Sequence, residues 1–370
     1  MGFCQPALMR YHINALRSAR PWSVGLSVAF ALGCFMPPAR GAWVDVTGNL
    51  AGLPSECGNL CLLSVVPGQD KIIAGIAKRG LWATTDGGAT WVPLGQGAGS
   101  DAIVNRPSRI VYDPTNSEVF WESGIYNSSG VYQTTDGGQT FHHLGKITHN
   151  DYVSLDFADP RRQTLLAGGH EQSHKVWKSV DGGQNWSNIG SNLPPGTKFS
   201  SSPLLLNAST YLVNASGWGK GTGGVFRTAD GGVTWTTAST LEANGAPLVA
   251  SDGTLYWLLM YDRGLLRSTN QGQTWVQACG YGVLKGSHLL ELPDGRLAAV
   301  GGKSIKISSD QGGTWTPVAE PTPVQPAGVV YAPARQAFFI WQWDCGNKVL
   351  TNAIFRCDFP IQARASQTPR

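Results

Sequence analysis

One eight-residue motif occurs six times along the chain, and this repetition constrains the fold more than any other feature. Each copy opens on Ser or Thr, has Asp or Asn two positions later, then a glycine-containing turn, and ends on an aromatic residue. The copies begin at Thr84, Thr134, Ser179, Thr228, Ser268 and Ser308. Their third residues lie 50, 45, 49, 40 and 40 positions apart, which is the period of one four-stranded propeller blade. The sequence therefore predicts an all-β propeller.

Composition agrees with many short strands joined by tight turns. The 370 residues include 47 Gly, 22 Pro and 14 Trp, and only 14% are charged, against roughly 25% in an average soluble protein. A coiled coil or helical bundle would be rich in Ala, Glu, Lys and Leu, so this composition excludes it. Aromatic and β-branched residues are plentiful, which argues against disorder.

The repeated motif resembles the Asp-box, or bacterial neuraminidase repeat, of sialidase-like propellers. In such a hairpin the Asp accepts backbone hydrogen bonds, and Gly supplies the positive φ of the turn. Asn270 replaces the Asp in the fifth copy. The resemblance covers residues of roughly 43–360 and implies the fold. It leaves the activity open, because sialidases, other glycosidases, polysaccharide lyases, sorting receptors and a photosystem II assembly factor share it.

The two ends of the repeat region predict how the ring closes. After the sixth copy, Val329–Ala332, Ala337–Trp343 and Ala353–Phe359 are expected to be three strands of a last blade, and no fourth strand follows. The segment Trp43–Thr47 resembles the missing outer strand. We therefore predict a seven-bladed propeller closed by an N-terminal strand, which removes exposed sheet edges. Six blades plus a cap is the alternative.

The N-terminus is typical of an export signal. Residues 1–41 contain four arginines, no acid and the apolar run Pro21–Met36, which is too short for a membrane span of roughly 20 residues. We expect residues 42–360 to form a single propeller domain and 361–370 a C-terminal tail. The protein would be extracellular or periplasmic, and a lipid-anchored form through Cys34 is a minor alternative. No stable membrane span is expected.

Removal of the leader makes the chain neutral. The 28 basic residues minus the four arginines of the leader leave 24, against 24 acidic residues. A broad positive surface for nucleic acid is therefore not expected. In an oxidising compartment disulfides are permitted among Cys57, Cys61, Cys279, Cys345 and Cys357. Cys57 and Cys61 are close enough to pair, and Cys345 has Cys357 or the first pair as alternative partners.

The face of the propeller that carries the long loops is the expected functional face. Strands of a blade are antiparallel, so the Asp-boxes share one face with the short turns between the first two strands, and the irregular loops lie on the other. The candidate catalytic residues on that face are His149, Asp151, His170, Glu171 and Asp262. The candidate substrate-binding residues are Arg79, Tyr126, Trp218, Tyr261 and Arg263. No cofactor or metal ion is expected.

Each candidate also has a purely structural interpretation. His149 and Asp151 stand where a strand begins and are equally compatible with capping it. Asp262 and Arg263 are equally compatible with a local ion pair, and Trp218 with packing between blades. The box aspartates are assigned no catalysis.

Three functions are compatible with this arrangement. The first is a secreted glycoside hydrolase, in which two carboxyl groups from Asp151, Glu171 and Asp262 flank a glycosidic bond. The second is a polysaccharide lyase, in which Arg79 or Arg263 neutralises a uronate and His149, His170, Tyr126 or Tyr261 removes a proton. The third is a non-catalytic glycan-binding or assembly-factor propeller. We expect a monomer that acts on a carbohydrate, and the hydrolase is the leading hypothesis.

Overall fold

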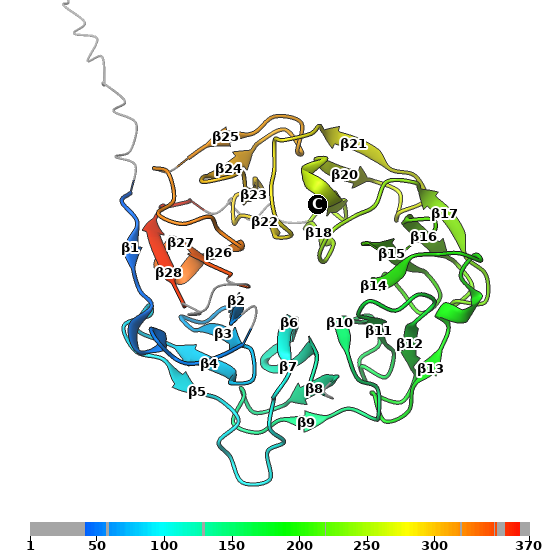
Figure 1. Cartoon of the computed structure of the whole chain (residues 1–370), viewed down its shortest axis with the longest axis horizontal. Helices are drawn as coiled ribbons and strands as arrows, with labels where there is room; N and C mark the ends of the chain where they lie inside the picture. The colour runs from blue at the N-terminus through cyan, green and yellow to red at the C-terminus, as the bar shows by residue number, and fades with distance from the viewer. Residues whose placement is uncertain are drawn as a thin grey trace, which may run out of the picture. The chain divides into compact units, whose positions relative to one another are not determined.

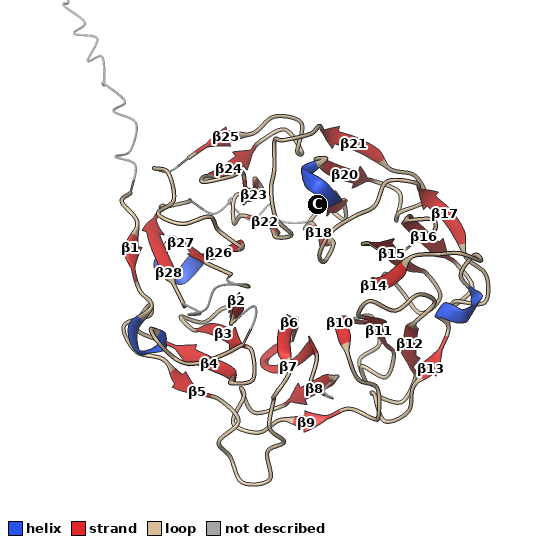
Figure 2. Ribbon diagram, viewed as in Figure 1, coloured by secondary structure: helices blue, strands red, loops and turns tan. Residues whose placement is uncertain are grey.

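The computed structural model describes residues 41–56, 59–127, 130–218, 220–318, 320–343, 345 and 352–362. These residues form seven four-stranded antiparallel sheets arranged as blades around a ring (Figure 1). The predicted export signal, apart from Gly41, and the end of the predicted tail from residue 363 onward lie outside the described residues. Helical structure in the described part of the chain is limited to short 3-10 turns (Figure 2).

In the first three blades the chain runs from the innermost strand outward. Blade 1 consists of β2 (Leu60–Val65), β3 (Ile72–Ile76), β4 (Gly80–Thr84) and β5 (Val92–Pro93). Blade 2 consists of β6 (Arg106–Asp113), β7 (Asn116–Ile125), β8 (Val131–Thr134) and β9 (His142–His143). Blade 3 consists of β10 (Asn150–Leu155), β11 (Leu165–Gly169), β12 (Val176–Ser179) and β13 (Ser187–Asn188).

Blades 4 to 6 repeat the same order. Blade 4 consists of β14 (Phe199–Leu205), β15 (Tyr211–Ser216), β16 (Gly224–Thr228) and β17 (Thr236–Ser239). Blade 5 consists of β18 (Leu248–Val249), β19 (Leu255–Leu258), β20 (Leu265–Ser268) and β21 (Val276–Cys279). Blade 6 consists of β22 (Leu289–Glu291), β23 (Leu297–Val300), β24 (Ile305–Ser308) and β25 (Thr316–Pro317). The 3-10 turns are η1 (Gly48–Leu50), η2 (Gly190–Asn192), η3 (Met260–Asp262) and η4 (Pro333–Arg335).

Blade 7 combines the two ends of the described chain. Its inner strands are β26 (Gly328–Ala332), β27 (Ala337–Trp341) and β28 (Ile354–Asp358), and its outer strand is β1 (Val44–Asp45). Strands β1 and β28 are antiparallel, with Val44 opposite Arg356. The predicted seven-bladed ring closed by an N-terminal strand is confirmed, and the alternative of six blades plus a cap is wrong.

The Asp-box residues are occupied in holding their own turns. The Asp136 carboxylate accepts hydrogen bonds from the Thr140 backbone N–H at 2.9 Å, the Thr140 hydroxyl at 2.6 Å and the Thr134 hydroxyl at 2.8 Å. Partial desolvation raises the pKa of this carboxyl, but the hydrogen bonds outweigh it and hold the pKa at about 2. In the fifth copy Asn270 accepts the corresponding N–H of Thr274 at 3.0 Å. An amide therefore replaces the carboxylate without loss of this contact.

Buried apolar clusters fill the wedges between neighbouring blades, and the described residues form seven of them. The cluster between blades 1 and 2 joins Ile73 and Leu81 to Phe120 and Phe141. Phe141 is the aromatic residue that ends the second box. The corresponding Trp91 of the first box lies in the cluster between blades 7 and 1. Because each cluster draws on two blades, a single blade cannot bury its own faces.

The cysteines of the described chain are mostly thiols. Cys345 is in a disulfide, whereas Cys279 and Cys357 are buried free thiols. A Cys345–Cys357 bond is therefore excluded. Cys57 lies outside the described residues. Cys61 is also a thiol, and its Sγ donates a hydrogen bond to the Asn59 carbonyl at 3.3 Å, so the predicted pairing of Cys57 with Cys61 is wrong. None of the described helices has the length and apolar character that crossing a membrane requires.

One carboxyl group is buried in the core without a charged partner. Glu122, on β7, is 0% exposed, and it accepts a hydrogen bond from Asn105 Nδ2 at 3.1 Å. Its Oε1 has no hydrogen-bond partner. Burial raises the pKa of Glu122 from 4.5 to about 8, although the Asn105 hydrogen bond lowers it. At neutral pH this side chain is a neutral acid.

We predict that Glu122→Gln removes a pH-dependent loss of stability. The unfolded carboxyl ionises near 4.5, whereas the folded one keeps its proton up to about 8. The folded state binds the extra proton between these values, so the free energy of unfolding falls as pH rises, by at most ~1.4 kcal/mol per pH unit. Urea unfolding at several pH values measures this slope. Glu118→Gln on the same strand should keep it, and an unchanged slope in Glu122→Gln would contradict the assignment.

Candidate functional site

The loop face opens into a central cavity of about 690 Å³. Its walls come from loops and inner strands of blades that are far apart in sequence. Charged and aromatic side chains of this wall are Arg106, Asp151, Tyr152, Asp262, Lys285, His288 and Trp343. Both signs of charge therefore meet in one concave space, as in sites that bind polar ligands.

A chain of three polar side chains extends from Asp151, which lines this cavity on the blade 3 side. Both carboxylate oxygens of Asp151, on β10, lie 2.9 Å from Nδ1 of His170, which directly follows β11. The other ring nitrogen, Nε2, lies 3.3 Å from the hydroxyl of Tyr126, which directly follows β7. When Nδ1–H of His170 donates a hydrogen bond to Asp151, Nε2 accepts a hydrogen bond from the Tyr126 hydroxyl. We call this the Asp151–His170–Tyr126 chain.

Glu171 provides the same histidine with a second acidic partner. Its Oε1 lies 3.0 Å from Nε2 of His170. A neutral His170 donates to Asp151 and accepts from Tyr126, whereas a protonated His170 donates to Asp151 and Glu171. Both protonation states are hydrogen-bonded, so the imidazole is suited to take up and release a proton.

His149 completes the aromatic surroundings of the chain. Its ring lies 4.8 Å from that of His170 and 5.1 Å from that of Tyr126. Its Nδ1 accepts the backbone N–H of Tyr126 at 3.0 Å. Burial, followed by the nearby His170, lowers the pKa of His149 below 6.5. His149 is therefore a neutral hydrogen-bond acceptor that positions the Tyr126 loop.

The loops of this face hold strained backbone. Tyr126, His149 and Glu171 have φ values of 65°, 63° and 52°, in the left-handed region that costs a non-glycine residue free energy. Among the described residues, eight of the twelve non-glycine residues with positive φ lie on the loop face. The ring holds these side chains in conformations that an isolated loop would avoid.

Arg106 belongs to this site, although the sequence analysis did not select it. It begins β6, lines the central cavity, and its guanidinium lies 5.3 Å from the Tyr126 ring and 5.7 Å from the Trp343 ring. These contacts place a positive charge next to the Tyr126 phenol. The sequence signal that could have identified it is its position at the loop-face end of an innermost strand.

A smaller cavity of about 180 Å³ shares Asp151 with the central one and adds His170, Glu171 and Trp218. Trp218 is 73% exposed and packs edge-on against Phe199, with ring centroids 5.8 Å apart. It therefore presents most of its ring to solvent beside the Asp151–His170–Tyr126 chain. Packing between blades does not account for this exposure.

The remaining predicted residues are dispersed. Asp262 lines the central cavity and forms an ion pair with Lys285 at 3.5 Å. The alternative of a local ion pair between Asp262 and Arg263 is therefore wrong. Arg263 lies over the exposed ring of Tyr261 at 5.7 Å. Arg79 lines a separate cavity of about 380 Å³, and its Nε donates to the Pro54 carbonyl at 2.7 Å. Arg79 is therefore not part of the central site.

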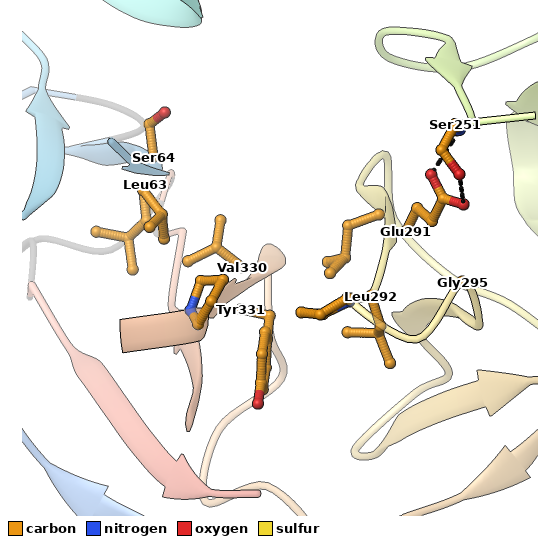
Figure 3. A pocket seen from close by; sticks show the side chains of 12 residues that line it. Leu63, Ser64, Ser251, Glu291, Leu292, Gly295, Val330 and Tyr331 are labelled. Atoms are coloured by element: carbon orange, nitrogen blue, oxygen red, sulfur yellow. Dashed lines mark hydrogen bonds between the residues drawn. The ribbon is translucent and has the colours of Figure 1, made fainter. Parts of the chain in front are cut away.

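Another cavity, of about 600 Å³, lies on the Asp-box face (Figure 3). Its wall is mainly apolar and includes Leu63, Val330 and Tyr331. Its carboxylate, Glu291, accepts hydrogen bonds from the backbone and hydroxyl of Ser251, both at 2.7 Å. The described residues that line this space include no histidine and no basic side chain, so proton transfer is better placed on the loop face. The described residues contain no cluster of three His, Cys, Asp or Glu suited to a metal ion.

Comparison with known proteins supports the fold and a distant similarity to a xyloglucanase. No known family model matches the chain. It is 23% identical over 296 residues to a xyloglucanase of a Paenibacillus species, a match that covers 66% of this chain and 28% of that protein. The chain thus spans less than a third of the length of that relative.

Two solved structures share the propeller. The GH74 xyloglucanase from Xanthomonas campestris superposes with a TM-score of 0.56 at 16% identity, covering 85% of this chain and 55% of the other. YCF48 bound to D1 peptide superposes with a TM-score of 0.55 at 14% identity, covering 90% and 98%. The chain is a seven-bladed Asp-box-like propeller. Its fold is similar to the propellers of a GH74 xyloglucanase and of YCF48.

We predict that His170→Gln raises the pKa of His149. Burial is the larger cause of its lowered pKa and remains in the variant, but the electrostatic effect of His170 is lost. The pKa of His149 should therefore rise and still stay below 6.5. NMR titration of the imidazole C–H signals measures this change. His142→Gln, at an exposed position on β9, serves as the control, and no rise in the His170 variant would argue against their close contact.

Proposed function

We propose that the protein cleaves a glycan at the central cavity of the loop face. The observation that carries this proposal is the Asp151–His170–Tyr126 chain, whose carboxylate orients an imidazole toward a phenol. Such an arrangement transfers protons to or from a bound reactant. The distant relationship to a xyloglucanase supports a glycan as the reactant.

Aromatic rings around the chain supply the binding surface for a sugar. Trp218 and Trp343 are 73% and 46% exposed, and they line the two neighbouring cavities. Flat aromatic faces bury the apolar C–H face of a pyranose, while polar groups at the rim bind its hydroxyls. The central cavity is large enough for more than one sugar unit.

Hydrolysis is the leading reaction. The Asp151–His170–Tyr126 chain would deliver a proton to the leaving oxygen, and Glu171 or Asp262 would activate water as a carboxylate base. Asp262 lines the same cavity as Asp151, and Glu171 lines the smaller one with it. The match to a xyloglucanase favours this reaction over the alternatives.

Elimination is the second candidate, and Arg106 is the observation that favours it. Its guanidinium lies next to the Tyr126 ring, where it would neutralise a uronate carboxylate and lower the cost of removing the neighbouring proton. The Tyr126 oxygen, having passed its proton to His170, would take that C–H proton. The C–H electron pair forms the C=C bond, and the C–O bond breaks with its electron pair on the leaving sugar oxygen, which would take the proton that His170 received.

A screen of the purified protein against neutral and acidic polysaccharides, with xyloglucan included, tests the proposal. New reducing ends without ultraviolet absorbance establish hydrolysis, and reducing ends with the absorbance of an unsaturated uronate establish elimination. Tyr126→Phe and His170→Gln should each lower the rate by roughly 10²- to 10⁴-fold, because proton transfer is lost. His142→Gln should leave it unchanged. Binding to a glycan or a peptide without any cleavage would overturn the proposed enzymatic function. The protein would then be a non-catalytic binding propeller, an alternative that the similarity to YCF48 bound to D1 peptide supports.

Export remains part of this proposal. The arginine-rich, acid-free segment 1–41 supports it, and the disulfide of Cys345 agrees with an oxidising compartment. We expect the exported chain to begin at about residue 42, because small residues precede that position. Mass spectrometry of the mature N-terminus measures the cleavage point. A chain recovered from the cytoplasm with its leader intact would contradict export.

A further inference from the structure

A guanidinium group near the centre of the ring has no counter-ion among the residues that the structure describes. Arg109 lies on β6, the innermost strand of blade 2. Its buried Nε has no hydrogen-bond partner, and no ion pair involves Arg109 within the described parts of the chain. Arginine stays protonated in proteins, so this position carries a positive charge that the described residues leave unpaired.

The side chains that surround this charge are neutral. Tyr152, on the innermost strand of blade 3, affects the pKa of Arg109 electrostatically. The charge of Arg109 in turn lowers the pKa of His288, which directly precedes the innermost strand of blade 6. Burial raises the pKa of Tyr152 far above 10, so its hydroxyl keeps its proton. Burial lowers the pKa of His288 to about 4, so its ring is uncharged at neutral pH. Tyr152 can donate a hydrogen bond, and neither group compensates Arg109.

The acids that line the central cavity are engaged elsewhere. Asp151 contacts His170 at 2.9 Å, and Asp262 contacts Lys285 at 3.5 Å. Glu122 of the same blade is a neutral acid at neutral pH, because burial raises its pKa to about 8. A charged group with a buried and unpaired N–H is costly, and the usual remedy is an anion that binds to it.

The central cavity gives such an anion access. Ser108, the neighbour of Arg109 on β6, lines this cavity, and so do Tyr152 and His288. Arg109 itself is partly exposed. A ligand that enters from the loop face therefore reaches the part of the wall next to Arg109 in the chain, which also includes Tyr152.

We propose that Arg109 binds a carboxylate group of the ligand that occupies the central cavity, with the Tyr152 hydroxyl as an additional donor. A planar carboxylate matches the paired N–H groups of a guanidinium. A doubly charged phosphate would meet repulsion from Asp151 and Asp262 in the same cavity. The inference rests on the proposed function for its biological ligand, which is then an acidic glycan containing uronate. The carboxylate site itself does not depend on cleavage.

Binding of D-glucuronate and D-glucose to the full chain, measured by calorimetry or by ligand-observed NMR, tests the inference. The two sugars differ in the carboxylate, so glucuronate should bind measurably tighter to the wild-type protein. Arg109→Met should weaken glucuronate by at least about ten-fold, because a charge-assisted bidentate contact is lost, and should leave glucose unaffected. Arg109→Lys, which keeps the charge without the paired geometry, should be intermediate and also serves if the Met variant does not fold.

The control variant is Arg161→Gln, which removes an exposed arginine from a turn on the Asp-box face and should bind glucuronate like the wild type. Equal binding of the two sugars, or tight glucuronate binding in both Arg109 variants, would overturn the inference. Glucuronate binding that depends on Arg109, in a protein that cleaves no polysaccharide, would keep the inference and defeat the proposed function. If the protein cleaves glycans, and neither glucuronate binding nor the cleavage rate changes in the Arg109 variants, the proposed function stands and the inference about Arg109 fails.

Discussion

The pairing of β1 with β28 is the interaction on which the rest of the structure depends. It places an N-terminal strand in the last blade, so the ring has no open sheet. A propeller blade buries its faces only against its two neighbours, and the seven apolar clusters between blades exist only in a closed ring. Closure therefore stabilises all interfaces together, although it directly involves only a few residues.

The site follows from this rigidity. Tyr126, His149 and Glu171 hold positive φ values, and the backbone strain persists because the strands on either side are anchored in their blades. The same rigidity keeps Asp151 and His170 aligned, since each follows or belongs to a strand of blade 3. A flexible loop would relax these conformations, and the hydrogen bonds between the three side chains would loosen.

Much of the fold was predictable because the Asp-box is a local signal. Its turn residues and its period locate the strands within a residue or two, and even the closing segment was expected at Trp43–Thr47 and found as Val44–Asp45. The blade 3 residues were found by their position on predicted loops. Arg106 and Arg109 were not selected, because nothing in the sequence near them shows that they meet Tyr126, Tyr152 or His288 across the ring.

The sequence by itself determined the blades, their number and the face on which the long loops lie, because turn chemistry and strand periodicity are local properties. Only the tertiary structure decided which loops meet. Tyr126 of blade 2 contacts His170 of blade 3, and Asp262 pairs with Lys285 and not with Arg263. Arg79 lines a separate cavity and lies outside the site. The tertiary structure also left Arg109 without a counter-ion in the described part of the chain. These outcomes depend on distances between blades, which are set by ring closure and by the packing of side chains between sheets.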